Sequence, residues 1–276
     1  MKTPKKIHYC WYGRGPLSEK QKMCIASWQA VMPEYELVLW NEDNSPMDNA
    51  YLRNALAHQK WANASNFLRL YALEKLGGLY FDTDVQALRS FDPLLKHDCF
   101  LGFQYDHNTS PKKRLNRSIN NAISGAAPGH PFVRQCLEQL QERFDGTEPA
   151  DQSGPHMASD ILVRQGLTDY SPTPITIAGC TIFPADYFSP YFYGEAFDLS
   201  CITDNTFTLH HWDASWVKKP TTPKGPDPDE TASRDRKIKD LTELATALRS
   251  ERDAVLSSRS WKITRPLRRL AGLIQR

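Results

Sequence analysis

Residues 61–84, WANASNFLRLYALEKLGGLYFDTD, contain the clearest secondary-structure pattern of the chain. Its first part places apolar side chains along a broad helical stripe, which predicts a helix over 61–76. Two glycines, Gly77 and Gly78, follow immediately and are typical of a helix C-terminus, because glycine adopts positive φ angles without strain. Residues 79–81 then have the pattern of a short buried strand, which ends at Asp82-Thr83-Asp84. Open α/β sheets bind their ligands at this end of the strands.

The carboxylates of Asp82 and Asp84 are the main candidates for chemistry. Side chains at i and i+2 of a strand project to the same side, so a following loop can turn both acids toward one cation. Oxygen ligands suit Mg²⁺ or Mn²⁺. Without a cation, two converging negative charges would repel each other. An Asp-x-Asp sequence is common and weak evidence by itself, but its place after a buried strand favours a metal site.

The residues around this stretch alternate between strand and helix patterns. A β-rich run over 7–12 precedes a helix that Ser18 can cap and that continues to about Val31, and a second strand follows over 36–40. Such alternation predicts an α/β fold with a mostly parallel sheet. Beyond residue 100 the pattern is weaker. There we predict strands over 100–103, 176–183 and 207–211, and helices over 131–144 and 159–165.

Composition indicates an ordinary globular chain. The 276 residues are 40% hydrophobic and 24% charged, and the net charge of +2 is too small to indicate a nucleic-acid partner. The six cysteines form no C-x-x-C pair, so we interpret them as small buried side chains in a reducing compartment. No apolar run has the length of a signal peptide core or a membrane span. We therefore expect a cytoplasmic location.

Proline and charge divide the chain into unequal parts. We predict a main domain over 1–217, a linker over 218–231 that contains four prolines, and a helical tail over 232–276. Residues 229–276 carry 12 Lys/Arg against 7 Asp/Glu. Heptad-like apolar spacing in the tail allows a short coiled coil and therefore a homo-oligomer. Its basic, apolar end favours association with the anionic cytoplasmic face of a membrane, and a solvated tail is the alternative.

Several spaced motifs make residues 5–217 resemble the DXD-containing sugar transferases of glycosyltransferase family 32. That group includes yeast outer-chain mannosyltransferases and bacterial capsule and O-antigen enzymes, and the glucosylating core of large bacterial toxins is similar. The matching motifs occur in order along the chain: 7–13, 27–28, 40–43, 63–73, 77–84, 129–132 and 210–216.

The resemblance implies a GT-A fold, a nucleotide-sugar-binding α/β domain in which Asp82 and Asp84 hold Mn²⁺ or Mg²⁺ against the donor diphosphate. It also implies a retaining reaction, a UDP-sugar as donor, and an oligosaccharide or lipid-linked glycan as acceptor. The acceptor would be a growing capsular, O-antigen or other cell-surface polysaccharide.

Individual roles are also implied by the resemblance. Asp84 would ligate the metal, Asp82 would contact the ribose or sugar and the metal shell, and Arg69 would steady the donor. The other donor-side positions are Tyr9, Trp11, Asn66 and Trp216. Core packing is the alternative for Tyr9 and Trp11. Many relatives carry Asp where this chain has Asn66, so the identity of the sugar stays open.

Weaker assignments concern a third metal ligand and the acceptor. Either histidine of the pair at 210 and 211 could supply a metal or phosphate contact, and we favour His211, with a structural role as the alternative. Gly154, Pro155 and Asp160 are expected on the acceptor side, where Asp160 or Asn121 could be catalytic.

Two other functions fit part of the sequence. A metal-dependent nucleotidyltransferase also uses paired carboxylates on a strand. A non-catalytic interaction protein would rely on the helical tail instead.

Overall fold

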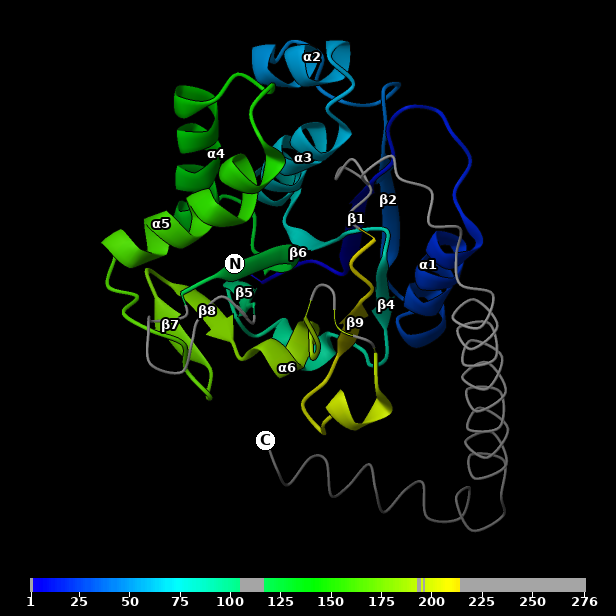
Figure 1. The fold of residues 1–276 in the computed structure, drawn as a ribbon, viewed down its shortest axis with the longest axis vertical. Helices are drawn as coiled ribbons and strands as arrows, with labels where there is room; N and C mark the ends of the chain where they lie inside the picture. Colours follow the sequence, from blue (N-terminus) through cyan, green and yellow to red (C-terminus); the bar gives the residue numbers. More distant parts are fainter. Residues whose placement is uncertain (1, 105–116, 193–194, 196, 214–276) are drawn as a thin grey trace. The chain divides into compact units, whose positions relative to one another are not determined.

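The structure is a computed structural model that describes residues 2–104, 117–192, 195 and 197–213 (Figure 1). These residues all belong to the first of the two compact units of the chain, residues 1–217. The predicted linker and tail lie outside the described residues, so the domain boundaries stay a prediction. Among the described residues, no helix combines the length and the apolar character needed to cross a membrane.

A seven-stranded sheet forms the centre of the described domain, in the order β2-β1-β3-β6-β5-β8-β7. In this sheet, β6 and β7 run opposite to the other five strands, so the prediction of a mostly parallel sheet is confirmed. The strands are β1 (Lys6–Cys10), β2 (Glu36–Trp40), β3 (Gly78–Phe81), β5 (Cys99–Phe103), β6 (Ile119–Ala126), β7 (Ile175–Ile177) and β8 (Cys180–Phe183).

A separate two-stranded ribbon pairs β4 (Val85–Ala87) with β9 (Thr208–His210). It brings the end of the described chain next to the Asp-x-Asp turn, although more than a hundred residues separate the two segments in sequence. The helices are α1 (Glu19–Val31), α2 (Ala50–Ala57), α3 (Trp61–Leu76), α4 (Pro131–Arg143), α5 (Met157–Arg164) and α6 (Ala185–Phe188), with short helical turns η1 (Asp92–Leu94), η2 (Gln152–His156) and η3 (Leu199–Cys201).

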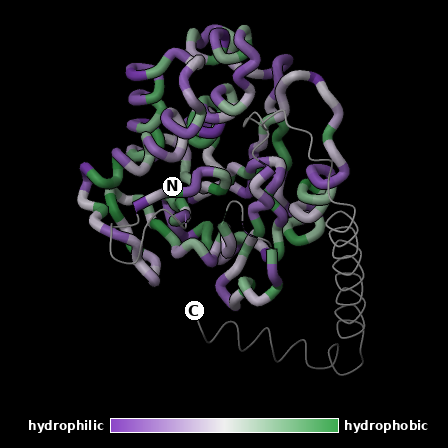
Figure 2. Tube along the Cα trace, in the orientation of Figure 1, coloured by the Kyte–Doolittle hydropathy of each residue, from purple (hydrophilic) through white to green (hydrophobic). Residues whose placement is uncertain are grey.

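Apolar cores lie on both faces of the sheet. On β3, Tyr80 belongs to the core under α2, α3, α4 and α5, whereas Leu79 and Phe81 belong to the core beneath α1. This alternation is the side-chain period of a strand buried on both faces. Along α4, hydrophobic and hydrophilic stretches alternate as expected for a helix with one buried side (Figure 2). All six cysteines are free, and five are buried.

The elements next to the Asp-x-Asp turn form for the predicted reasons. Ser18 caps α1 in a capping box with Gln21. Helix α3 ends at Gly77, whose φ of 64° suits glycine and where a Cβ would lie 2.5 Å from Pro128. The chain therefore turns sharply from α3 into β3, and β3 delivers Asp82 to the edge of the sheet.

Several elements differ from the predictions. Strand β6 was not predicted because its sequence, INNAISGA, is rich in polar and small residues. Its Gly125 is required by packing, since a Cβ there would lie 2.4 Å from the Phe100 ring. The predicted strand over 176–183 is a hairpin of β7 and β8, whose turn contains Ala178 and Gly179 at positive φ. Helix α2 was also not predicted.

Candidate active site

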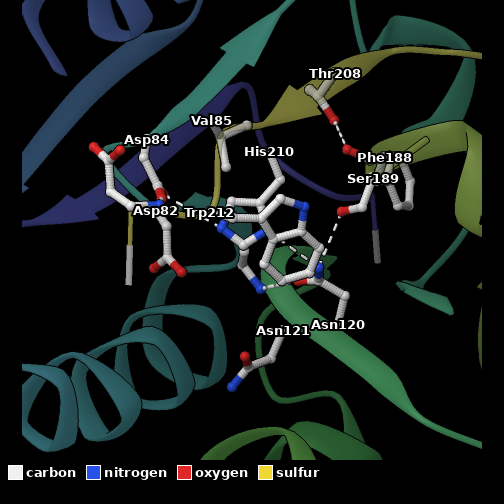
Figure 3. Close-up of polar contacts among 12 residues, drawn as sticks. Asp82, Asp84, Val85, Asn120, Asn121, Phe188, Ser189, Thr208, His210 and Trp212 are labelled. Atoms are coloured by element: carbon white, nitrogen blue, oxygen red, sulfur yellow. Dashed lines mark hydrogen bonds and ion pairs between the residues drawn. The ribbon is translucent and has the colours of Figure 1, made fainter. Parts of the chain in front are cut away.

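Asp82, Thr83 and Asp84 form the tight turn between β3 and β4. The amide of Asp82 donates to the carbonyl of Ala122 on β6 (2.9 Å), and the amide of Val85 donates to the carbonyl of Asp82 (3.0 Å). The backbone of the turn is therefore fixed between the sheet and the ribbon. Figure 3 shows both carboxylates near His210 of β9.

Asp84 is buried and accepts hydrogen bonds from the segment that follows β9. Its Oδ2 accepts a hydrogen bond from the amide of Asp213 (2.8 Å), and its Oδ1 lies 3.4 Å from His210 Nε2. Its own carbonyl accepts from the amide of His211 (3.0 Å). Burial opposes ionisation, but His210 and the Asp213 amide outweigh it and hold the pKa of Asp84 below its ordinary value. Asp84 is therefore a carboxylate in the metal-free protein.

Asp82 is bound by a buried arginine. Arg69 on α3 is only 5% exposed, and its Nη2 lies 2.9 Å from Asp82 Oδ1. Its Nη1 donates to the carbonyl of Asn121, and its guanidinium lies 4.4 Å from the centre of the Tyr80 ring. Burial raises the pKa of Asp82, and Arg69 opposes that rise. Arg69 thus acts on the Asp-x-Asp turn through Asp82.

His210 completes a group that could hold a cation. Ligand atoms of Asp82, Asp84 and His210 all lie within 4.8 Å of one another. Two carboxylates and one imidazole are a suitable donor set for a divalent ion, and the nitrogen donor favours Mn²⁺ over Mg²⁺, which prefers oxygen throughout. The site therefore fits the metal that the sequence implied.

The geometry places His210, and not the predicted His211, in the group that could hold a cation. His211 Nε2 lies 3.0 Å from Gln86 Oε1 of β4 and is not part of the metal-ligand group. Burial lowers the pKa of His211 to about 4. The two neighbouring imidazoles thus contact different groups, and His210 is the one beside the carboxylates.

The loop after β9 is held by contacts that the sequence did not reveal. Trp212 has a φ of 53°, which is unusual for a residue other than glycine, and its ring lies 4.0 Å from the His210 ring. Its indole nitrogen donates to the carbonyl of Tyr191 (3.0 Å). Lys20 of α1 pairs with Asp213. Backbone strain at such a position is typical of functional loops.

The expected donor-side aromatic residues lie at the end of β1. Tyr9 packs edge-on against Trp28, with ring centres 5.4 Å apart, which agrees with the core-packing alternative. Trp11 is half-buried, and its indole nitrogen donates to the carbonyl of Gly15 (2.6 Å). Contact of either ring with a donor stays a prediction. Trp216 lies outside the described residues.

Asn66 joins α3 to the segment around η2. Its side-chain nitrogen donates to the carbonyl of Ala150 (2.8 Å) and to Ser153 Oγ (3.3 Å). Pro155 lies inside η2, and Asp160 is exposed in the first turn of α5. The described contacts bring Gly154 close to Asn66 and Asn121, and they do not link Asp160 to the Asp-x-Asp turn. The acceptor-side roles stay predictions.

Gly154 is sterically required. A Cβ at Gly154 would lie 2.8 Å from both Asn121 Nδ2 and Asn66 Oδ1. Gly154→Ala is therefore expected to destabilise the protein by about 1–3 kcal/mol through overpacking, measured by urea unfolding. Gly15→Ala is the matched control, because nothing lies within 4 Å of its Cβ position. Equal stability of the two variants would contradict the packing around Gly154.

Two matches with known families coincide with this site. Residues 18–101 match the glycosyltransferase sugar-binding region containing the DXD motif, and residues 125–227 match the alpha 1,4-glycosyltransferase conserved region. The first match contains the Asp-x-Asp turn, and the second contains His210. Each match covers less than half of this chain, and both matched regions are named for glycosyltransferases. The DXD pair lies at the end of a strand in a mostly parallel sheet, which agrees with the predicted α/β fold of the GT-A type.

Curated relatives are similar to part of this chain. Inositol phosphoceramide mannosyltransferase 3 of Schizosaccharomyces pombe is 32% identical over 146 residues, which are 50% of this chain and 37% of the relative. Human alpha-1,4-N-acetylglucosaminyltransferase is 25% identical over 181 residues, 62% of this chain and 48% of the relative. The matches thus span less than half the length of these relatives.

Among solved structures, the PaToxG glycosyltransferase is similar at 19% identity and a TM-score of 0.47, over 60% of this chain and 70% of that chain. The galactosyltransferase LgtC, crystallised with donor and acceptor sugar analogues, is similar at 15% identity and a TM-score of 0.43, over 88% of this chain and 95% of that chain.

Proposed function

We propose that the protein is a metal-dependent, retaining glycosyltransferase that transfers a sugar from a UDP-sugar to a glycan acceptor. One observation carries the proposal: Asp82, Asp84 and His210 offer ligand atoms within 4.8 Å of one another at the end of β3. The two family regions, which meet at this site, support the class of reaction.

Asp84 and His210 would hold a Mn²⁺ ion directly, and Asp82 would complete its shell or contact the donor sugar. A divalent ion bound there neutralises charge that develops on the departing nucleoside diphosphate. Arg69 is a positioning residue in this proposal, because it is buried against Tyr80 and its terminal nitrogens already bind Asp82 and Asn121. It opposes the rise in the pKa of Asp82 that burial causes, and it orients the Asp82 carboxylate.

Retention is proposed without a covalent intermediate. The described carboxylates of the site, Asp82, Asp84 and Asp213, are engaged by Arg69, His210 and Lys20 respectively, so we assign none as a nucleophile. The acceptor hydroxyl would attack the anomeric carbon on the face that the diphosphate leaves. The carbon–oxygen bond to the diphosphate breaks, a bond to the acceptor oxygen forms, and the proton passes to the leaving phosphate oxygen.

The acceptor we propose is a lipid-linked glycan, in particular a growing capsular, O-antigen or other cell-surface polysaccharide. The names of three relatives support a lipid-linked acceptor, because they describe mannosyl transfer to inositol phosphoceramide or the synthesis of mannosyl phosphorylinositol ceramide.

Incubation with a panel of nucleotide sugars and Mn²⁺ tests the reaction. Transfer or donor hydrolysis releases free UDP, whereas a nucleotidyltransferase releases pyrophosphate. Release of UDP that stops on addition of EDTA is the expected result. Pyrophosphate as the product, or no turnover with any donor, would overturn the proposal.

The two neighbouring histidines provide a sharp test of the metal site. His210→Ala is expected to weaken Mn²⁺ binding by at least about tenfold, because it removes a ligand. His211→Ala should leave the Mn²⁺ dissociation constant within about threefold, because its Nε2 contacts Gln86 instead. Isothermal titration of both variants measures this. A larger loss in His211→Ala than in His210→Ala would contradict the assignment.

Association with the cytoplasmic face of a membrane through residues 232–276 is a further part of the proposal. Its support is the basic, apolar composition of that segment. The full chain is expected to float with liposomes that contain anionic lipid, and substitution of Arg265, Arg268 and Arg269 by Gln should abolish most of that binding. Equal flotation of both proteins would exclude an electrostatic anchor.

A further inference from the structure

A side chain that the proposed reaction has not used contacts the ring of His210. Asn120 of β6 is only 4% exposed. Its Nδ2 lies 3.2 Å from His210 Nδ1 and donates to Ser189 Oγ (3.0 Å). Figure 3 shows the imidazole between Asp84 on one side and Asn120 on the other. Both nitrogens of the ring therefore face a protein group.

The orientation of the Asn120 amide is fixed by a backbone donor. Its Oδ1 accepts a hydrogen bond from the amide of Ala122 (2.8 Å). A backbone N–H can only donate, so the side-chain oxygen must face Ala122 and the NH₂ group must face His210 and Ser189. An amide turned the other way would place two donors against each other at Ala122.

This orientation decides which nitrogen of His210 carries the proton. Because Asn120 donates to Nδ1, Nδ1 is an acceptor and a neutral imidazole carries its proton on Nε2. Nε2 then points its N–H toward Asp84 Oδ1, 3.4 Å away. In the metal-free site, the Nε2–H of His210 therefore faces the Asp84 carboxylate.

The same proton conflicts with metal binding through Nε2. A neutral imidazole that binds a cation through Nε2 must carry its proton on Nδ1, where it would meet the NH₂ group of Asn120. Metal-ligating histidines usually donate their second N–H to a carboxylate or carbonyl oxygen. In this protein the group that faces Nδ1 is the side-chain nitrogen of Asn120, which is a donor and not an acceptor.

We propose that Asn120 is a positioning residue that sets the metal affinity of the site by holding His210 in the Nε2–H form. This inference rests on the proposed function in assigning His210 as a metal ligand. Cation binding requires the proton to move to Nδ1 and the Asn120 amide to turn, which costs the hydrogen bond to Ala122. The Asn120 contact therefore lowers the affinity of the site for a cation, and it favours the contact between His210 Nε2–H and Asp84 when no cation is bound.

Nitrogen NMR of the metal-free full-length protein tests the first step. With ¹⁵N-labelled histidine at about pH 8, where an ordinary histidine is neutral, the resonances of His210 should show a protonated Nε2 and a bare Nδ1. They are assigned by their loss in His210→Gln. A protonated Nδ1 in the wild-type protein would overturn the inference, and this result does not depend on metal binding or on activity.

Asn120→Asp tests the second step. The new carboxylate accepts from both Ala122 and Nδ1–H, and the Ser189 hydroxyl can turn to donate to it. His210 should change to the Nδ1–H form, and the Mn²⁺ dissociation constant should fall by about tenfold. A melting temperature near that of the wild type shows that the variant is folded.

Two controls separate this effect from the added charge. Asn121→Asp adds the same charge to the next residue of β6 and should tighten Mn²⁺ binding by less than about threefold. In a His210→Ala background, Asn120→Asp should also tighten Mn²⁺ binding by less than about threefold. An equal gain with and without His210 would overturn the inference. Absence of Mn²⁺ binding in every protein would instead count against the proposed function, and the NMR result would still decide the role of Asn120.

Discussion

Asp84→Asn is expected to lower metal-dependent turnover of the sugar donor by about a thousandfold, since several kcal/mol of transition-state stabilisation depend on the bound ion. The amide oxygen can still accept the hydrogen bond from Asp213, so the loop after β9 should stay in place. The lost negative charge, however, removes the main electrostatic attraction for the cation. Mn²⁺ titration and the rate of UDP release measure the two effects separately.

Asp92→Asn is the matched control for Asp84→Asn. Asp92 is a carboxylate outside the metal-ligand group, where it pairs with Lys5 at 2.8 Å and is about half exposed. This variant should bind Mn²⁺ and release UDP like the wild type. Turnover in Asp84→Asn that matches this control would remove the basis for a metal-dependent reaction at the DXD pair.

The low pKa of Asp84 also predicts how acid affects the metal-free protein. Because its folded-state pKa lies below that of the unfolded chain, Asp84 contributes stability above about pH 4, and that contribution is lost as the pH falls further. The free energy of unfolding of Asp84→Asn should therefore depend less on pH over this range. An unchanged pH dependence would contradict the role of His210 and Asp213 in stabilising the carboxylate.

Arg69→Met is expected to have the largest effect on stability. The substitution leaves the half-buried Asp82 carboxylate without its cation, and breaking a buried pair in this way costs about 3–5 kcal/mol. Arg69→Lys should recover little, because one ammonium group cannot bind Asp82 and the Asn121 carbonyl in the same geometry and stack on Tyr80. Chemical denaturation monitored by tryptophan fluorescence measures the loss.

Arg14→Met provides the comparison for Arg69→Met. Arg14 pairs with Asp43 at 2.6 Å, but both side chains are about two-thirds exposed. Loss of such a surface pair should cost less than about 1 kcal/mol. A similar small loss in Arg69→Met would show that Asp82 does not need a buried cation.

The local sequence predicted the elements that carry the DXD pair. Helix α3 and strand β3 have clear apolar periods. Each is followed by a residue that favours the end of such an element, Gly77 after the helix and Asp82 after the strand, so local pattern and tertiary structure agree. The parallel start of the sheet was predictable for the same reason. The apolar pattern, the two glycines and the two aspartates all lie within residues 61–84, so a local reading of the sequence finds them.

The remaining part of the site depends on contacts between distant segments. Strand β6 supplies Asn120 and Asn121, but its polar and small residues give no strand signal. Buried contacts on both faces, rather than local preference, make it a strand. The choice between His210 and His211 depends on the pairing of β9 with β4, which no local pattern shows. The motif predicted a histidine near the acids, and only the strand register decides which one.

A crystal of the protein grown with Mn²⁺ and a UDP-sugar would locate the bound ion through anomalous scattering from manganese. An anomalous peak is expected within ligand distance of Asp84 Oδ and His210 Nε2, next to the donor diphosphate. A peak elsewhere, or a bound donor with both carboxylates turned away from any ion, would contradict the proposed metal site.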